Sequence, residues 1–320
     1  MRRPADAFPR GALPVLQGIV AVGFLAVLWQ VADGPKAALS LAAADPVWLV
    51  AGLVALTAQT VLSALRWRLT AAQLGIRLGA VGAVREYYLA QIVNQTVPGG
   101  VVGDAGRAVR ARSQAGLLAA GQSVLFERLA GQIAMVLTLA LGFLATWAVP
   151  GGLDWPGWLV GPVAGLLIAA ALAPVALRWA ARVPGGAGRR AAAIWRALGI
   201  ALATRSVLPA QVALSLGTTA CNLAAFACCA RAVHAPLPLV AVVALVPLIL
   251  ITMVIPLSPS GWGLREGAAA ALFPLAGLSA AQGLAASLAF GIAMLVASLP
   301  GVVAVWRPGW QAAPRDVTKP

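Results

Sequence analysis

Residues 84–112 read VREYYLAQIVNQTVPGGVVGDAGRAVRAR, a stretch that fits neither a membrane-spanning helix nor a simple loop. Its first part is an apolar helix, which must end near 98–100 because proline lacks the amide hydrogen that a helix needs. Asp104 can cap a second short helix that carries arginines. Non-helical backbone at membrane depth survives only inside the protein or beside a wet cavity, so we predict a re-entrant hairpin. The residues expected to form its tip are Pro98, Gly99, Gly100 and Gly103.

The whole chain is apolar enough to be a membrane protein. Of its 320 residues, 61% are hydrophobic and 10% are charged, and the mean hydropathy is +0.90. Soluble domains are about 45–50% apolar and roughly 25% charged. Because each crossing takes about 20 apolar residues, the chain has material for about eight transmembrane helices. We therefore expect an all-α polytopic protein with a single membrane domain over 1–320, a membrane-embedded core over 12–306 and a cytoplasmic tail over 307–320.

Tryptophans near the ends of the apolar segments support the predicted span boundaries, since indole prefers the membrane interface. The clear spans cover 12–31, 46–65, 128–149, 158–177, 207–230, 238–257 and 281–306. Four segments outside them are basic, namely the N-terminus, 66–85, 178–205 and the tail. The positive-inside rule then places both termini in the cytoplasm. We expect the protein to lie in a bacterial cytoplasmic (inner) membrane. This orientation requires an even number of crossings, and we expect 264–277 to supply the missing one.

The formal net charge is +14, from 23 Lys and Arg against 9 Asp and Glu. In a soluble protein such a charge would suggest nucleic acid. Here the basic residues lie in short loops without the interleaved aromatic residues of a nucleic-acid site, and they match cytoplasmic loops that face anionic lipid. We expect no nucleic-acid partner. The basic loop 178–205 also has apolar residues at helical spacing, which predicts an amphipathic surface helix.

A second interrupted stretch, 254–277, reads VIPLSPSGWGLREGAAAALFPLAG. Its break and the short helix that follows contain Pro259, Gly261, Gly263, Arg265 and Glu266. Short segments interrupted by glycine and proline, in corresponding halves of a chain, point to the binding site of a transporter. The likeness between this break and the one at 98–103 is compatible with an inverted repeat.

Charged residues inside apolar helices are candidates for function, because a charge at the bilayer centre costs about 2.5–3.5 kcal/mol by insertion scales. Glu127 and Arg128 are the clearest pair, and the alternative is a structural ion pair near the cytoplasmic interface. We expect them to form one internal cluster with Arg265 and Glu266. The residues predicted to bind substrate are Glu86, Asn94, Asp104, Arg107, Glu127, Arg128, Arg265 and Glu266.

Several motifs resemble one known family in their order and spacing, over about 12–306. They are RWRLTAAQLG (66–75), NQTVPGGVVGDAGRAVRAR (94–112), SVLFERLAG (123–131), PLSPSGWGLREGA (256–268) and SLPG (298–301). Together they resemble the lysylphosphatidylglycerol synthase transmembrane-region family, also called flippase-like proteins. The chain departs from the family pattern at Trp262, where the pattern leads us to expect a small residue, usually glycine.

That family includes the flippase half of the multiple peptide resistance factor, which moves aminoacylated phosphatidylglycerol between leaflets. Members that lack the soluble aminoacyltransferase domain, as this sequence does, have been linked to other lipids, including hopanoids and polyprenyl-linked sugars. The resemblance thus implies lipid handling and not aminoacylation.

The leading hypothesis is a lipid translocase that moves a phospholipid or a lipid-linked precursor between leaflets. Arg107, Arg128 and Arg265 would hold the phosphate, since the guanidinium fork matches phosphate oxygens, and the acidic residues would balance them or contact a cationic head group. A membrane enzyme acting on lipid head groups or lipid-linked sugars is one alternative, although no catalytic motif supports it. A lipid-binding partner subunit that does not transport is another. We expect no catalytic residue, no cofactor and no metal.

Overall fold

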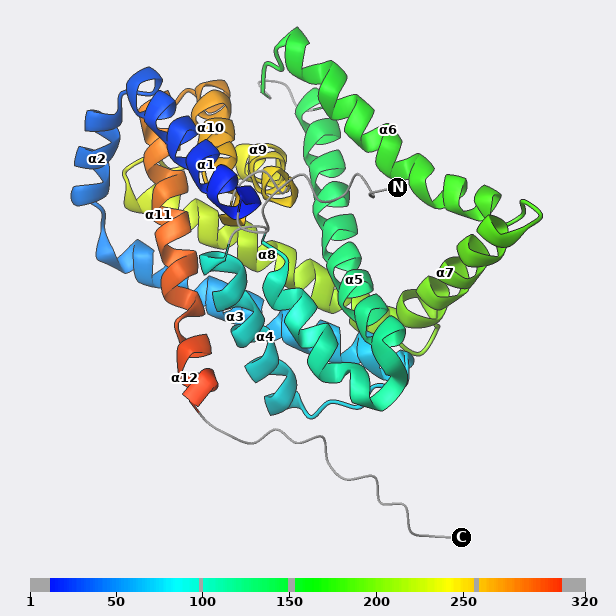
Figure 1. Ribbon diagram of the computed structural model, residues 1–320. Coiled ribbons are helices and arrows are strands. Elements are labelled where there is room, and N and C mark those ends of the chain that lie inside the picture. The colour runs from blue at the N-terminus through cyan, green and yellow to red at the C-terminus, as the bar shows by residue number, and fades with distance from the viewer. Residues whose placement is uncertain (1–11, 98–99, 149–152, 256–258, 307–320) are drawn as a thin grey trace, which may run out of the picture.

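The computed structural model describes residues 12–97, 100–148, 153–255 and 259–306, and every regular element within them is helical (Figure 1). The predicted all-α fold is therefore confirmed. The first half contains α1 Ala12–Val31, α2 Gly34–Ala42, α3 Pro46–Gln73, α4 Ala80–Thr96, α5 Val102–Ala148 and α6 Gly157–Ala180. The second half contains α7 Gly186–Ala203, α8 Leu208–Ala232, α9 Leu239–Ile251, α10 Leu264–Leu272, α11 Ala280–Ser298 and α12 Pro300–Trp306, with 3-10 helices η1 Thr252–Val254, η2 Pro259–Gly261 and η3 Phe273–Ala276.

The chain is a multi-pass membrane protein by the length and composition of its helices. Among the described residues, five helices are long and apolar enough to cross a membrane: Pro46–Gln73, Val102–Thr146, Gly157–Ala180, Leu208–Ala232 and Ala280–Ala304. The apolar helix Leu239–Val254 is shorter. The count of about eight crossings stays a prediction.

One expected span is not a single helix. Residues 264–277 form α10, of nine residues, followed by η3. At about 1.5 Å per residue, α10 rises only about 14 Å, whereas the hydrocarbon core is about 30 Å thick. Helix α10 alone is therefore too short to cross the membrane, and the expectation that 264–277 supplies the eighth crossing stays a prediction.

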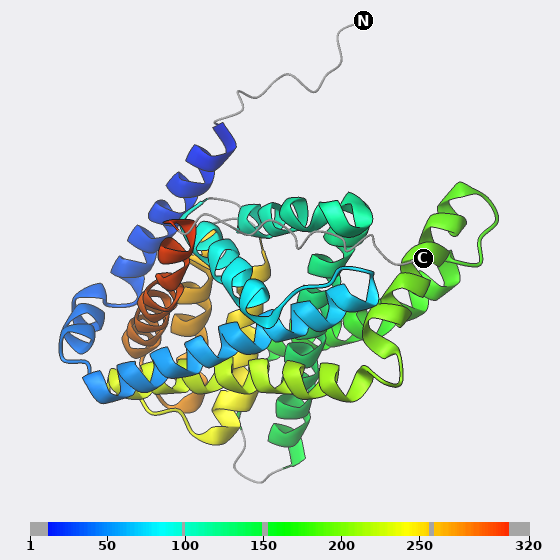
Figure 2. The same ribbon diagram turned by 90° about the horizontal axis from the view of Figure 1, so that it is seen from below.

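An antiparallel pair, α3 and α8, runs through the centre of the molecule (Figure 2). At one end the Asp45 amide donates to the Ala232 carbonyl, and at the other the Gln211 side chain donates to the Thr70 hydroxyl at 2.8 Å. The second bond joins two buried polar side chains, as is common where membrane helices pack together. This pair forms one wall of the cavity described below.

The fold of α5 depends on Gly116, which has φ 84° and ψ 165° inside the helix. Side chains other than hydrogen rarely adopt this backbone conformation, so the glycine lets the chain turn sharply. It divides α5 into a first arm, 102–115, and a second arm, 117–148. The first arm packs against α4, and both lie across one side of the molecule in Figure 2.

The predicted hairpin over 84–112 is present as two packed helices, α4 and the first arm of α5. A Cβ built on Gly103 would lie 2.0 Å from the Ala90 carbonyl oxygen, so the two helix backbones touch where only glycine fits. Gly100 lies in the connection, with a φ of 61°. Pro98 and Gly99 fall outside the described residues. That the hairpin enters and leaves the membrane on the cytoplasmic side stays a prediction.

Two predicted boundaries were wrong for the same reason. Helix α3 continues to Gln73, so Arg66 lies within it, and α5 begins at Val102 rather than at 128. In both places we ended the apolar span at a charged residue. The charges lie inside the helices because they pair with each other, as the next subsection describes.

The second interrupted stretch is also a real break. Ser260, Gly261 and Gly263 all have positive φ values, of 49°, 75° and 90°, which a continuing right-handed helix cannot accommodate. After the break, α10 packs on α11, and Phe273 and Phe290 pack on Phe226 of α8. Pro256–Ser258 lie outside the described residues.

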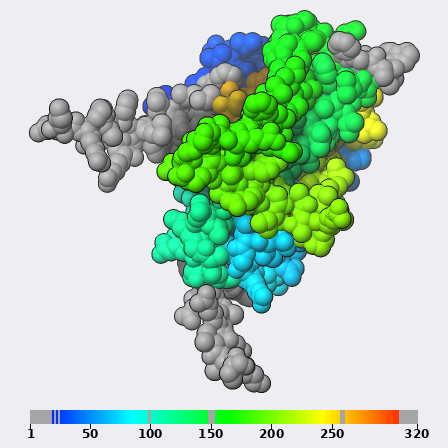
Figure 3. Space-filling view, turned by 90° about the vertical axis from the view of Figure 1, so that its right-hand side faces the viewer, coloured from blue at the N-terminus to red at the C-terminus, as the bar shows by residue number. Residues whose placement is uncertain are grey.

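Helices α6 and α7 form a V beside the rest of the molecule and cover the upper part of the face shown in Figure 3. The amphipathic helix predicted within 178–205 is α7. Trp195 and Leu198 are half-buried on one side of α7, while Arg189 and Arg196 are exposed. Its contact with anionic lipid stays a prediction.

Candidate functional site

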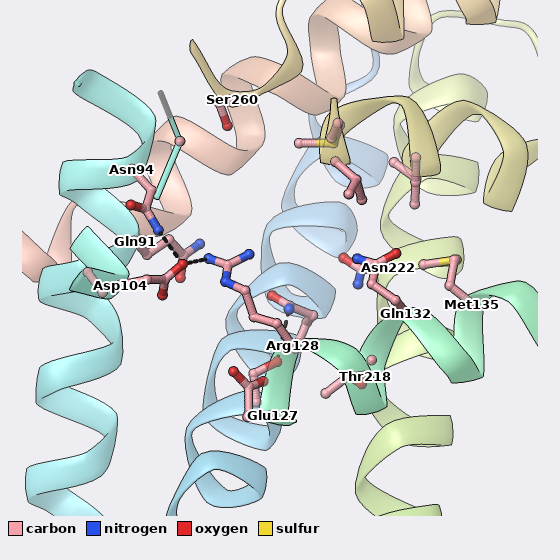
Figure 4. A pocket seen from close by; sticks show the side chains of 18 of the residues that line it. Gln91, Asn94, Asp104, Glu127, Arg128, Gln132, Met135, Thr218, Asn222 and Ser260 are labelled. Carbon is pink, nitrogen blue, oxygen red and sulfur yellow. Dashed lines mark hydrogen bonds and ion pairs between the residues drawn. The ribbon is translucent and has the colours of Figure 1, made fainter. Parts of the chain in front are cut away.

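A cavity of about 480 Å³ lies between α3, α4, α5 and α8, with α9, α11 and the two breaks around it (Figure 4). Its floor is polar, although it is enclosed by helices that are apolar over most of their length. The polar and charged side chains that line it include Gln59, Ser63, Arg66, Gln91, Asn94, Asp104, Glu127, Arg128, Gln132, Thr219 and Asn222. A cavity of this size is within the range of small-ligand sites.

Glu127, on the second arm of α5, is fully buried and forms ion pairs with two arginines. One carboxylate oxygen, Oε1, accepts from Arg66 Nη2 at 2.7 Å, and Oε2 accepts from Arg107 Nη2 at 2.9 Å. Tyr87 of α4 also donates to Oε1, at 3.4 Å. A buried carboxylate must be paired and hydrogen-bonded to offset its lost hydration, and Glu127 meets this condition through α3, α4 and the first arm of α5.

Asp104, on the first arm of α5, is also paired with two arginines, one of which is again Arg107. Its Oδ1 accepts from Arg107 Nε at 3.0 Å, and its Oδ2 is paired with Arg128. Asn94 of α4 donates to the same Oδ2 at 3.2 Å and accepts the Gly103 amide at 2.7 Å. Figure 4 shows Arg128 extended toward Asp104 and Asn94 from the facing helix.

The guanidinium of Arg107 is held between two aromatic rings. It lies 4.8 Å from the Trp67 ring centroid and 4.6 Å from that of Tyr87, and it is fully buried. Such stacking stabilises an arginine that has left water. Arg107 is therefore a fixed charge buried behind the cavity wall, whereas 46% of the Arg128 side chain is exposed.

The charges of this cluster do not cancel. Three guanidinium groups, on Arg66, Arg107 and Arg128, face two carboxylates, on Asp104 and Glu127. Four of these five residues line the cavity, and Arg107 lies buried behind them, paired with both carboxylates. Among the described residues no further charged side chain lines the cavity. In a low-dielectric surrounding, one excess positive charge favours an anion.

The rim of the cavity is apolar and exposed. Leu125 and Leu129 on α5, Val101 at the hairpin and Val254 of η1 all line the cavity and are all exposed. Within a membrane, such side chains face lipid tails. The cavity thus joins a charged floor to an apolar opening.

The two interrupted stretches, distant in sequence, meet at this cavity. Gly100 and Ser260 both line it, and a Cβ on Gly100 would lie 4.0 Å from the Ser260 amide nitrogen. Gly103, which was predicted to be part of the break, lies instead in the first turn of α5, where its missing side chain allows the close contact with α4. Gly261 and Gly263 flank the second break, and the side chain of Pro259 falls outside the described part of the chain.

Arg265 and Glu266 are brought together, but not with Glu127 and Arg128. Glu266 Oε1 accepts from Arg265 at 2.5 Å and from Ser287 at 3.0 Å, and its Oε2 accepts the Gly263 amide at 2.6 Å. Both charged residues are buried, and neither lines the cavity. The expected single cluster of four is therefore two separate groups, and this second one is a closed, neutral pair that fastens the start of α10 to α11.

Glu86 also lies apart from the cavity. It pairs with Arg110 at 2.5 Å on the opposite face of the hairpin, beside a second hollow of about 670 Å³. Of the predicted substrate-binding residues, the structure thus brings Asn94, Asp104, Arg107, Glu127 and Arg128 together. The ion pairs that join them connect residues before Gly116 with residues after it.

Arg66 is not among the residues predicted to bind substrate, because the sequence analysis predicts a basic loop over 66–85. It is 4% exposed and reaches both Glu127 and, at 2.8 Å, the Thr218 hydroxyl. A signal was available, because Gln59, Ser63, Arg66 and Thr70 recur on one face of a helix. That polar stripe predicts that α3 continues past 65.

A buried, positively charged cavity that opens through an apolar rim defines a class of protein: a multi-pass helical membrane protein with a site for an amphiphile. The comparison with protein families agrees with this class. The chain belongs to the family described as lysylphosphatidylglycerol synthase TM region, whose model matches residues 15–301. This family consists of membrane proteins that act on lipids. A search of curated proteins found no match.

Proposed function

We propose that this protein is a lipid translocase, which moves a phospholipid or a lipid-linked precursor between the leaflets of the cytoplasmic membrane. The proposal rests on one observation: a single cavity is lined by charged side chains in its interior and by exposed apolar side chains at its rim. A lipid has the same two parts, so its head group would enter the cavity while its tails stay in the bilayer. No covalent chemistry is needed for this movement.

Arg128 is the residue proposed to take the phosphate. Its side chain is half-exposed in the cavity, and Asp104 keeps Arg107 and Asn94 as partners when Arg128 turns away. Arg66 and Arg107 stay on Glu127 and supply fixed positive charge. A guanidinium suits this role because its planar fork binds two phosphate oxygens.

The proposed setting is a bacterial inner membrane with both termini in the cytoplasm. The hairpin of α4 and the first arm of α5 would then be re-entrant from the cytoplasmic side, and it would carry Asp104 to membrane depth. Irregular backbone at that depth is tolerated beside a polar cavity, and Gly100 does line this one.

The test is lipid exchange in proteoliposomes that contain a phosphatidylglycerol labelled on one acyl chain. Dithionite destroys the label in the outer leaflet only, so exchange is seen as loss of the protected half. We expect rapid loss with the wild type and at least a tenfold slower loss with Arg128→Gln. Arg110→Gln is the matched control, because Arg110 is also on α5, half-exposed and ion-paired, but lies outside the cavity. Wild-type vesicles that behave like protein-free vesicles would overturn the proposal.

A further inference from the structure

Neither carboxylate of the cavity is vacant in this structure, and Asp104 keeps Arg107 and Asn94 as partners when Arg128 turns away. Both oxygens of Glu127 accept from arginines, and both oxygens of Asp104 do so as well. A head group that carries an ammonium would therefore find no vacant anionic partner, and it would meet a cluster that already has one positive charge in excess. Like charges in a low-dielectric site repel strongly.

Neutral polar side chains, by contrast, are available. Among the described residues, no hydrogen bond joins the side chains of Gln95, Gln132, Thr219 or Asn222 to another part of the protein, although all four line the cavity. Figure 4 shows Gln132 and Asn222 turned toward each other across the space beside Arg128. Amides and hydroxyls both donate and accept, which is what the hydroxyl groups of a polyol or a sugar require.

We infer that the cavity selects a lipid whose head group has a single phosphodiester and neutral hydroxyls, and that it rejects a head group bearing an ammonium. This inference rests on the proposed function and names its substrate class. One phosphodiester carries one negative charge, which matches the single excess positive charge of the cluster. The phosphate would lie on Arg128, and the hydroxyls would lie between Gln132 and Asn222.

Two lipid sources share this chemistry, and the test separates them. Phosphatidylglycerol has a glycerol head group, and a polyprenyl phosphate-linked hexose has a sugar on the same kind of phosphodiester. Lysyl-phosphatidylglycerol has the same phosphodiester with added ammonium groups. Phosphatidic acid has a phosphomonoester, with more negative charge and no head-group hydroxyls beyond the phosphate.

The first experiment measures binding without transport. The protein is placed in nanodiscs with equimolar amounts of these four lipids, and the lipids retained on release are counted by native mass spectrometry. We expect the two phosphodiesters with free hydroxyls to be retained at least tenfold over lysyl-phosphatidylglycerol and over phosphatidic acid. The ratio between the first two identifies the source. Equal retention of lysyl-phosphatidylglycerol would overturn the inference.

The second experiment reverses the selectivity. Gln132→Glu changes the shape of the side chain very little but adds a carboxylate to the cavity, which brings the charge of the cluster to zero. We expect retention to shift at least tenfold toward lysyl-phosphatidylglycerol, while Arg110→Gln leaves the ratio unchanged. A merely structural role for Gln132 would change the amount of folded protein and not the ratio.

The two proposals fail in different ways. Selective retention without exchange in proteoliposomes would leave the head-group inference intact and would overturn translocation. Exchange of all the lipids at equal rates would support translocation and overturn the selectivity. If Gln132→Glu does not fold, the wild-type ratios still decide the question, and Asn222→Asp makes the same charge change from α8.

Discussion

Arg66 of α3 and Glu127 of α5, which are 61 positions apart in the chain, form an ion pair of 2.7 Å in which both side chains are buried. The pair does not stand alone, since Arg107 occupies the second oxygen of Glu127. Burying charges costs more than a single ion pair returns. A buried cluster of several charged side chains inside a membrane protein is therefore expected at a functional site, because it does not serve stability alone.

Replacing Glu127 by Gln should destabilise the fold strongly. The change leaves the buried guanidiniums of Arg66 and Arg107 without their shared carboxylate, and breaking a buried pair in this way costs about 3–5 kcal/mol. Thermal unfolding in detergent should show a clear drop in Tm. Glu86→Gln is the control, because its partner Arg110 is half-exposed and water can solvate it. Similar losses for the two variants would contradict the assignment of Glu127 as the centre of the cluster.

Arg265→Gln should also lower the stability, and it should do so without changing lipid selectivity. Without Arg265, the buried Glu266 keeps Ser287 and the Gly263 amide as its partners among the residues that the structure describes. The double variant Arg265→Gln, Glu266→Gln removes both charges, so we expect it to recover a large part of the loss. The measurement is Tm for the single and double variants, together with the retained-lipid ratio. A changed ratio in the folded double variant would place this pair in the binding site after all.

Gly103→Ala should separate the two helices of the hairpin. Its Cβ would lie 2.0 Å from the Ala90 carbonyl oxygen, which is backbone and cannot rotate away. Overpacking of this kind costs about 1–3 kcal/mol or more, and it should also move Asp104 away from Asn94. Gly121→Ala, on the same helix with nothing within 4 Å of its Cβ, is the control. Unchanged Tm and lipid exchange for Gly103→Ala would show that the contact is not required.

Topology can be tested independently of function. Reporter fusions at the C-terminus should be active in the cytoplasm, and fusions near Asp154, between α5 and α6, should be active in the periplasm. The expectation follows from the basic segments at 178–205 and the tail, since Lys and Arg are retained on the cytoplasmic side. A periplasmic C-terminus would mean an odd number of crossings, and the hairpin of α4 and α5 would then need a new orientation.

The sequence was sufficient for the class of fold and for the positions of most helices, because long apolar runs and interrupted segments are local signals. Both breaks, the one between α4 and α5 and the one around Gly261, were predicted for this reason. The site was predictable only in part. Asp104, Glu127 and Arg128 were recognised as charges in apolar surroundings, but a single sequence contains no record of which charge faces which.

Three particular errors follow from that limit. Arg66 was placed in a loop because its partner Glu127 is distant in the chain, although the polar stripe on α3 would have corrected the boundary. Glu86 was grouped with Asp104 because both lie in the hairpin, yet they face opposite sides of it. Arg265 and Glu266 were joined to Glu127 by analogy between the breaks, whereas adjacent residues and Ser287 already satisfy them.

Gly116 has a consequence that extends beyond local backbone geometry. Asp104 and Arg107 precede it, Glu127 and Arg128 follow it, and both ion pairs between the arms close across it. The two arms are helical segments joined at Gly116, and the cavity lies beside the ion pairs that connect them. Any change of angle at this one pivot must lengthen or shorten both ion pairs together, so the width of the cavity and the state of its charges form a single coupled degree of freedom.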